Sequence, residues 1–283
     1  MKALLPLCAA LFSGCIQTIA IRAVGNIVDE GFGAIAGEQD LAFAEQALPA
    51  NLKLLEVMLK GDPDNERILL LLSEGYSSYA LGFVEDKDVE RARMFYLRGK
   101  EFGMRVLQQD PWLAQALRGS PEDLKTELGR RGRDDVRAVF WTAFGLGSYI
   151  NLSLTDPDAL IELPRAEAMM RFVASTDSSF YYGGAYLFLG TLYGSRPRIL
   201  GGDADLSRQY FEKALAINRG KFLMTHVYYA RSYAVQTLNE SLFDDLLRKV
   251  DEATLEILPE FRLANAIAKQ KAKSLLSRKA KLF

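Results

Sequence analysis

The stretch from residue 180 to residue 220 constrains the fold most, because it contains two apolar helical faces separated by an unusual loop. Leu189 and Tyr193 recur at helical spacing, which places them on one face of a first helix. Gly190 lies beside them and would let a second helix, which contains Phe211, approach closely. This pattern predicts a chain that folds by packing neighbouring helices against each other.

The same pattern recurs along the chain and resembles the tetratricopeptide repeat, a pair of helices about 34 residues long. About four such pairs are predicted, and their first helices cover residues 66–84, 135–151, 180–194 and 221–239. The partner helices are predicted at residues 88–107, 158–175, 205–220 and 242–257. A helix at 40–60 precedes the pairs, and a basic helix at 260–283 follows them as a cap. Sustained alternation typical of strands is absent. The sequence therefore predicts an all-α, tetratricopeptide-like array of helical hairpins stacked into a superhelix, with a C-terminal capping helix.

The N-terminus resembles a bacterial lipoprotein signal. An apolar run at residues 3–12 is shorter than the ~20 residues of a membrane-spanning helix but suits an export signal. Ser13 and Gly14 precede Cys15 as in a lipobox, in which the cysteine is acylated. This predicts a signal peptide at 1–14, a lipid-attached tether with a short helix at 15–39, and a single helical domain at 40–283. A plain signal peptide or an uncleaved apolar helix is the alternative.

Several classes of function have no support in the sequence. The net charge is −1 and the pI is about 6.0, so nothing indicates nucleic-acid binding. Apart from Cys8 and Cys15 the chain has no thiol, and its single histidine, His226, takes the place of an aromatic residue between helices. No catalytic or metal-binding motif is present. We therefore expect no enzyme activity, no cofactor and no metal.

Two groups of residues are candidates for binding a ligand or a partner. The first consists of aromatic residues near the predicted helix seams, for which core packing is the alternative: Trp141, Tyr149, Tyr181, Tyr182 and Tyr193. The second is Arg196 and Arg198, in a loop at 194–205 that is about five residues longer than the repeat requires. Arginine suits carboxylates, and long loops are often functional; a salt bridge that braces the loop is the alternative.

A further arginine cluster lies in the polar, turn-rich segment 112–134 and consists of Arg130, Arg131 and Arg133. Charge clusters usually mark exposed surface, so we interpret this segment as a solvated loop between helices. A docking surface for an acidic partner is the alternative.

Five segments together resemble the T-component lipoproteins (TatT) of tripartite ATP-independent periplasmic (TRAP) transporters: residues 47–59, 91–107, 182–203, 221–235 and 261–276. The resemblance implies an all-helical periplasmic lipoprotein whose partner is a TRAP substrate-binding protein carrying an organic acid or a hydrophobic ligand. It also implies a homotrimer with a ligand-accessible central pore. Ile16, which follows Cys15, resembles the sorting signal for the outer membrane.

Two functional hypotheses follow. The first is a lipid-anchored transport accessory that docks a substrate-binding protein and binds or passes its ligand. The second is a tetratricopeptide scaffold that organises cell-envelope complexes and binds no small molecule.

Overall fold

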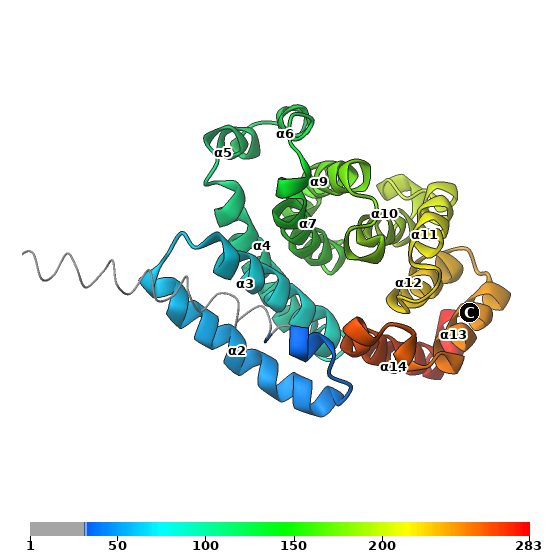
Figure 1. Ribbon diagram of the computed structural model, residues 1–283. Helices are drawn as coiled ribbons and strands as arrows, with labels where there is room; N and C mark the ends of the chain where they lie inside the picture. Colours follow the sequence, from blue (N-terminus) through cyan, green and yellow to red (C-terminus); the bar gives the residue numbers. More distant parts are fainter. Residues whose placement is uncertain (1–30, 32) are drawn as a thin grey trace, which may run out of the picture.

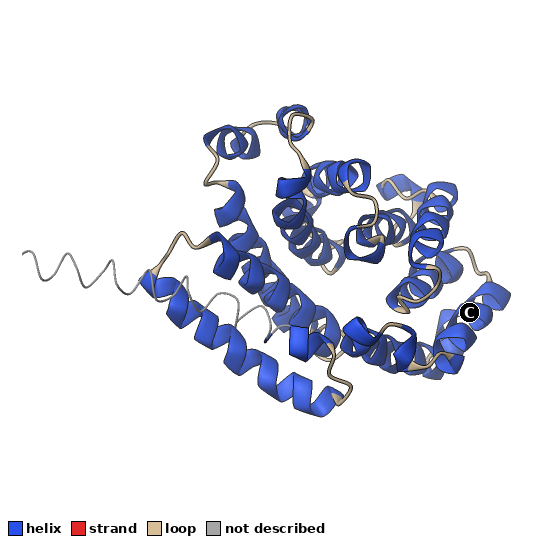
Figure 2. Cartoon of the chain, in the orientation of Figure 1, coloured by secondary structure: helices blue, strands red, loops and turns tan. Residues whose placement is uncertain are grey.

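The computed structural model describes residue 31 and residues 33–283, and this part of the chain consists of helices joined by loops, without a strand (Figures 1 and 2). The predicted all-α class is therefore confirmed. The predicted signal peptide at 1–14 and Cys15 lie outside the described residues. Within the described part, no helix is both long and apolar enough to cross a membrane.

From residue 41 onward, the helices follow one another with short connections. They are α2 (Leu41–Gly61), α3 (Glu66–Tyr79), η1 (Ala80–Val84), α4 (Val89–Leu107), α5 (Pro111–Arg118), α6 (Pro121–Leu128), η2 (Arg133–Asp135), α7 (Val136–Asn151), α8 (Pro157–Ile161), α9 (Leu163–Thr176), η3 (Phe180–Tyr182), α10 (Gly184–Gly194), η4 (Arg198–Leu200), α11 (Ala204–Asn218), α12 (Met224–Tyr228), η5 (Tyr229–Ala234), α13 (Glu240–Glu252), η6 (Leu255–Ile257), η7 (Pro259–Phe261), α14 (Arg262–Ser277) and α15 (Lys279–Leu282). The segments η1 and η5 are π-helical continuations of α3 and α12.

Polar side chains fix where several helices begin. Asp40 Oδ1 accepts hydrogen bonds from the backbone N–H groups of Ala42 and Phe43 at 3.0 and 3.1 Å, and Asn65 caps α3 in the same way. Asp88 caps α4. Each such cap satisfies an N–H group that the helix itself cannot, which stabilises the helix by about 1 kcal/mol.

Small residues determine how closely α4 approaches its neighbours. A side chain at Gly99 would collide with Ser77, and one at Gly103 would collide with Ser73 and Thr142. The contact of Gly99 with Ser77 and of Gly103 with Ser73 also shows that α3 and α4 run antiparallel. Helix α4 therefore lies tightly between α3 and α7.

The close approach predicted at Gly190 is present. A Cβ atom there would lie 3.0 Å from the ring of Phe211, which is fully buried between α10 and α11. Burying such a ring stabilises the fold by about 2 kcal/mol, and only a residue without a side chain at position 190 leaves room for it.

The first helices of the hairpins run side by side in the same direction. Near their beginnings, the ring of Tyr181, just before α10, lies 5.7 Å from Phe140 of α7 and 5.8 Å from Phe222, just before α12. Near their ends, Ser195 Oγ lies 3.2 Å from Ser232 Oγ. Because these helices are parallel, any space enclosed between them extends from the helix beginnings at one end to the helix ends at the other.

The last long helix closes the arrangement. In Figure 1, α14 (orange) lies beside the N-terminal helices, and it packs against α2, α12 and α13. A side chain at Gly82 of η1 would lie 2.7 Å from Ile267 Cδ1 of α14. The two ends of the helical chain are thus neighbours in space.

The interpretation of residues 112–134 as a loop is wrong, because this segment forms α5 and α6. Pro111 and Pro121 directly follow the N-cap residues Asp110 and Ser120, in the first turn of each helix, where proline is favoured. Leu113, in α5, is buried. Prolines and glycines that suggested a loop instead mark the beginnings and ends of two short helices.

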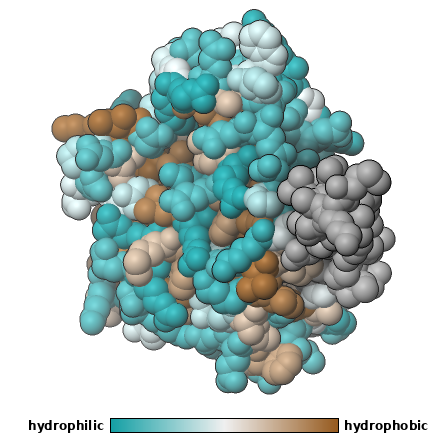
Figure 3. Space-filling view, turned by 90° about the vertical axis from the view of Figure 1, so that its left-hand side faces the viewer, coloured by the Kyte–Doolittle hydropathy of each residue, from teal (hydrophilic) through white to brown (hydrophobic). Residues whose placement is uncertain are grey.

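Other boundaries differ by less. The helix predicted at 158–175 divides at Glu162 into α8 and α9, and the helix predicted at 242–257 ends at Glu252. Figure 3 shows the side of the molecule that lies on the left of Figure 1, and this surface is largely hydrophilic, with hydrophobic residues in small groups. Most apolar side chains lie in the interior instead.

Candidate functional site

A cavity of about 480 Å³ lies between the first helices of the hairpins and α14. Its wall is mostly apolar and includes Leu81, Phe144, Leu187, Phe188, Met224 and Ile267. Residues 33, 35 and 36, which precede α2, also line it. Small-molecule sites typically enclose about 300–1,000 Å³ behind predominantly hydrophobic walls, so the cavity has the size and character of a ligand site.

An unusual backbone turn places Tyr181 in the wall of this cavity. Tyr181, Tyr182 and Gly183 have successive φ angles of 48°, 57° and 79°, and the left-handed conformation costs a residue with a side chain about 1–2 kcal/mol. The turn brings the Tyr181 ring edge-to-face with Trp141, at 5.0 Å, and with Phe261, at 5.2 Å. These contacts offset the strain, because aromatic pairs stabilise beyond their buried area.

The hydroxyl of Tyr181 remains protonated at neutral pH. Burial raises the pKa of this phenol well above its ordinary value, and the nearby charge of Glu74 raises it further, while Ser78 opposes the shift. Glu74 Oε2 accepts a hydrogen bond from Arg137 Nη2 at 3.1 Å. The aromatic end of the cavity therefore contains a neutral phenol and a carboxylate that is already paired.

A buried ionic cluster lies at the other end of the cavity. Glu85 Oε2 accepts a hydrogen bond from Tyr96 Oη at 2.6 Å. Its Oε1 accepts from Tyr228 Oη and Lys271 Nζ, each at 2.9 Å, and from Arg231 Nη1 at 3.2 Å. Burial raises the pKa of Glu85, but the charges of Lys271 and Arg231, together with the hydrogen bonds from Tyr96 and Lys271, hold this pKa below its ordinary value. The Glu85 carboxylate is therefore ionised at neutral pH.

Asp86 completes the ionic cluster. Its carboxylate lies 2.6 Å from Lys271 Nζ and 3.7 Å from Arg231 Nη1. The positive charges of Lys271 and Arg231 thus balance the negative charges of Glu85 and Asp86. Since Glu85 follows η1, Arg231 belongs to η5 and Lys271 to α14, the cluster joins three segments that are far apart in the sequence.

Comparison with protein families identifies the chain. The family model described as TRAP transporter T-component (TAtT) matches residues 37–283. The chain belongs to this family. The match covers all helices from α2 to α15, so these helices form the T-component domain, and the resemblance found in the sequence is confirmed. A comparison with curated proteins finds no match.

The structure of this T-component brings some of the predicted aromatic residues together. Trp141 and Tyr181 both line the cavity, with ring centroids 5.0 Å apart. Tyr149, Tyr182 and Tyr193 are partly buried but do not line it. Packing within the protein, the alternative considered from the sequence, therefore explains Tyr149, Tyr182 and Tyr193 better than ligand binding in this cavity does.

Each of these three tyrosines has a partner elsewhere on the T-component. The Arg93 guanidinium lies 5.6 Å from the Tyr149 ring. Tyr182 Oη donates to Glu260 Oε1 at 2.5 Å. Tyr193 Oη lies 2.5 Å from a carboxylate oxygen on α9 and 2.8 Å from an arginine on the same helix. Such contacts tie neighbouring helices together.

The two arginines of the 194–205 loop also lie away from the cavity lining. Arg196 is buried, and its Nε donates to the Leu192 carbonyl at 2.9 Å. Its Nη1 has no hydrogen-bond partner among the described residues, and burial lowers the pKa of the guanidinium. Arg198 is exposed, in η4. Arg196 thus braces the loop through a backbone carbonyl, while Arg198 remains on the surface.

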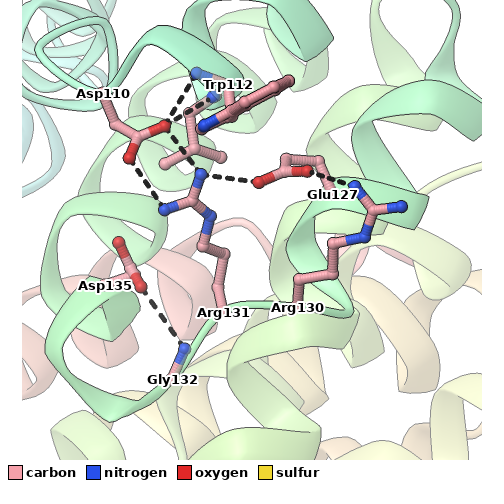
Figure 4. Close-up of polar contacts among 8 residues, drawn as sticks. Asp110, Trp112, Glu127, Arg130, Arg131, Gly132 and Asp135 are labelled. Carbon is pink, nitrogen blue, oxygen red and sulfur yellow. Dashed lines mark hydrogen bonds and ion pairs between the residues drawn. The ribbon is translucent and has the colours of Figure 1, made fainter.

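Figure 4 shows how Arg130 and Arg131, two of the three arginines of the cluster at 130–133, are arranged. Arg131 forms a two-pronged ion pair with Asp110, at 2.7 and 2.9 Å, and lies 2.6 Å from Glu127. Arg130 lies 3.2 Å from Glu127, and Arg133 Nε lies 3.4 Å from a carboxylate oxygen at the end of α9. Arg131 thus braces α5 and α6, while the side chains of Arg130 and Arg133 are 69% and 75% exposed.

His226 is buried in α12, as expected for a residue at a helix seam. Burial, helped by the charge of Lys249, lowers its pKa to about 4, so the imidazole is neutral at pH 7. Its Nδ1 has no hydrogen-bond partner among the described residues. The described chain also contains no group of three or more His, Cys, Asp or Glu residues that could hold a metal ion.

Several cavity residues were not predicted from the sequence. Glu85 and Arg231 line the cavity, and their partner Lys271 is 186 residues from Glu85. Because these residues are so far apart in the sequence, no local sequence pattern indicates that they pair. The position of Glu85, directly after a strongly apolar helix, is the one feature that could have suggested a buried charge.

Proposed function

We propose that this T-component is a periplasmic, lipid-anchored accessory of a TRAP solute transport system, which binds a largely apolar ligand in its central cavity and exchanges it with a docked substrate-binding protein. The family indicates association with a TRAP system and favours a transport role over catalysis. The observation that carries the proposal is the 480 Å³ apolar cavity in the family-matched chain.

The charges around the cavity favour a hydrophobic ligand over an organic acid. Arg231 is the only cation among the described cavity-lining residues, and it is already paired with Glu85 and Asp86. Arg196 and Arg198, which could have held a carboxylate, do not line the cavity. A ligand carboxylate would therefore enter without a free positive partner.

Ligand binding can be tested with a neutral naphthylamine dye whose fluorescence rises in apolar surroundings. We expect the dye to bind the wild type and to bind Ala264→Trp at least tenfold more weakly, because Ala264 lines the cavity and tryptophan would occupy it. Ala280→Trp, at an exposed position of α15, is the matched control. Absence of dye binding to the wild type would favour the scaffold hypothesis.

Docking can be tested by recovering partners of the anchored protein from the periplasm. We expect a TRAP substrate-binding protein, identified by mass spectrometry, to be recovered with the wild type. Recovery of envelope-assembly proteins alone would contradict the transport role and support a scaffold without a small-molecule ligand.

We also infer that the hairpins form a tetratricopeptide-like superhelix. The antiparallel hairpins, the parallel first helices and the contact of Gly190 with Phe211 support this arrangement. An experimental structure in which successive hairpins do not share a common rotation would contradict it.

Anchoring is proposed to occur through Cys15, with the protein attached to the outer membrane. We expect Cys15→Ala to move the protein from the membrane fraction to the soluble periplasm, because stable attachment requires acyl chains on this residue. Recovery of the variant with the membranes would show that another anchor exists.

We propose that the protein forms a homotrimer, as the family resemblance implies, through the outer face of α2. Phe43, Ala50, Leu54 and Val57 are exposed and recur at intervals of seven, four and three residues, the spacing of a coiled-coil seam. Exposed apolar stripes of this kind mark interfaces. Sedimentation should show a trimer for the wild type and a monomer for Leu54→Glu; a wild-type monomer would contradict the proposal.

A further inference from the structure

The ends of the cavity differ chemically, because the helices that line it run in the same direction. The lining residues at the helix beginnings are mainly aromatic: Phe140, Trp141, Tyr181, Phe222 and Phe261. The lining at or near the helix ends includes apolar Leu81, Phe83 and Leu192, but it also carries a group of polar residues: Glu85, Ser148, Asn151, Thr191 and Arg231. A ligand that fills the cavity therefore meets an apolar end and an end that carries polar groups.

Most of the polar groups at this end are already used within the protein. Glu85 and Arg231 belong to the ionic cluster, and Thr191 Oγ1 donates to the Leu187 carbonyl at 2.9 Å. Ser148 and Asn151 differ, because neither side chain forms a hydrogen bond to any other described residue, and both line the cavity.

Ser148 and Asn151 lie one turn apart near the end of α7, on the side that faces the cavity. Residues three apart on a helix are neighbours, so a single ligand group can contact both. A serine hydroxyl and an asparagine amide each donate and accept hydrogen bonds. The pair is therefore suited to a head group that also does both.

The electrostatics of this end disfavour a negatively charged head group. Helix α7 ends at Asn151, and the unpaired carbonyl groups of a helix C-terminus carry partial negative charge. The charges of the ionic cluster are balanced, so Arg231 cannot serve a ligand anion without leaving Glu85 and Asp86 short of a partner. A neutral head group avoids both costs.

We propose that the cavity binds an elongated amphipathic ligand whose neutral head group, an alcohol or a carboxamide, hydrogen-bonds to Ser148 and Asn151. The apolar tail lies toward the aromatic end, against Tyr181 and Phe261. This inference rests on the proposed function, since it describes the ligand of the same cavity.

The test compares two probes that have the same apolar tail and different head groups. Decanol and decanoate are each used at pH 7 to displace the bound naphthylamine dye from the full-length protein. We expect decanol to displace the dye at a concentration at least tenfold lower than decanoate. We expect Asn151→Leu to reduce this ratio about tenfold, because its amide can no longer bond to the hydroxyl.

A matched control is Gln209→Leu, which makes the same kind of change at an exposed position of α11 and should keep the wild-type ratio. Equal displacement by both probes, or tighter binding of decanoate, would overturn the inference while leaving ligand binding itself intact. Since the wild-type comparison needs no variant, equal displacement or tighter binding of decanoate overturns the inference even if Asn151→Leu does not fold. Failure of the wild type to bind the dye would instead reject the proposed function.

Discussion

Replacing Lys271 by methionine tests whether the ionic cluster holds α14 against the segment that follows η1. Lys271 Nζ lies 2.9 Å from Glu85 and 2.6 Å from Asp86, and the lysine side chain is 5% exposed. Methionine keeps the apolar stem and removes the charge. Breaking a buried ion pair from one side costs about 3–5 kcal/mol when the remaining charge has no other partner.

The cost here should be smaller, because Glu85 keeps Arg231 at 3.2 Å and two tyrosine hydroxyls. We expect Lys271→Met to lower the free energy of unfolding by about 2–3 kcal/mol. At about 2–4 °C per kcal/mol for a domain of this size, the melting temperature should fall by roughly 4–12 °C. Circular dichroism during heating and urea titration measures both quantities.

The pH dependence supplies a second measurement on the same variant. Because the pKa of Glu85 is lowered by folding, its stabilising contribution is present above the pKa of the unfolded chain. That contribution is lost as the pH falls through the lowered pKa of the folded state. Removing Lys271 weakens the attraction that opposes burial, so acid unfolding of Lys271→Met should begin at a higher pH than in the wild type.

Two controls test whether the loss of stability in Lys271→Met is caused by the loss of its ion pair with Glu85. Lys273→Met, at an exposed position two residues along α14, should change stability by no more than about 0.5 kcal/mol. In a Glu85→Gln background, Lys271→Met should cost at least about 1 kcal/mol less than it does alone. An equal cost in both backgrounds would refute the reasoning, since the loss would then not depend on the charge of Glu85.

Three further predictions concern single positions. Gly190→Ala should destabilise the fold by about 1–3 kcal/mol in urea titration, because the added methyl group would lie 3.0 Å from the Phe211 ring; an unchanged midpoint would contradict the tight packing. Folding lowers the pKa of His226 to about 4, so below pH ~6.5 the unfolded chain binds more protons than the folded protein. The free energy of unfolding of the wild type should therefore fall by about 2 kcal/mol between pH 7 and 5. His226→Phe should reduce this pH dependence, and an unchanged pH dependence would exclude His226 as its source. Leu238 is exposed with φ of 53°, so Leu238→Asn should raise stability by about 1 kcal/mol in the same titration, because asparagine tolerates this conformation; a lower midpoint would show that the leucine side chain stabilises the loop.

Local patterns in the sequence were sufficient to predict the main helices. The apolar face containing Leu189 and Tyr193, and the glycine at position 190, correspond to α10 and its tight contact with α11. In α5 and α6 the same kind of reasoning failed, because residues 112–134, which include Pro121, were interpreted as a loop. Proline is equally compatible with the first turn of a helix, so only the pairing of each proline with the preceding cap distinguishes the two cases.

The cavity was only partly predictable. Trp141 and Tyr181 were candidates because of their residue types, and both line the cavity. The left-handed turn at Tyr181, which directs its ring there, leaves no signal in residue type, since tyrosine is uncommon in this conformation. Glu85 was missed because its burial depends on Lys271, and contacts between distant segments form only when the whole chain has folded.

The position of α14 beside η1 also affects how the protein unfolds. In an open array each hairpin contacts only its neighbours, so the terminal units can fray while the centre stays folded. Here Glu85 and Lys271 join segments 186 residues apart, so within the described residues neither η1 nor α14 is a free edge from which unravelling can begin. Loss of α14 would expose η1 as well as α12, and melting should therefore be a single cooperative transition, with hydrogen exchange in η1 and α14 slowed together.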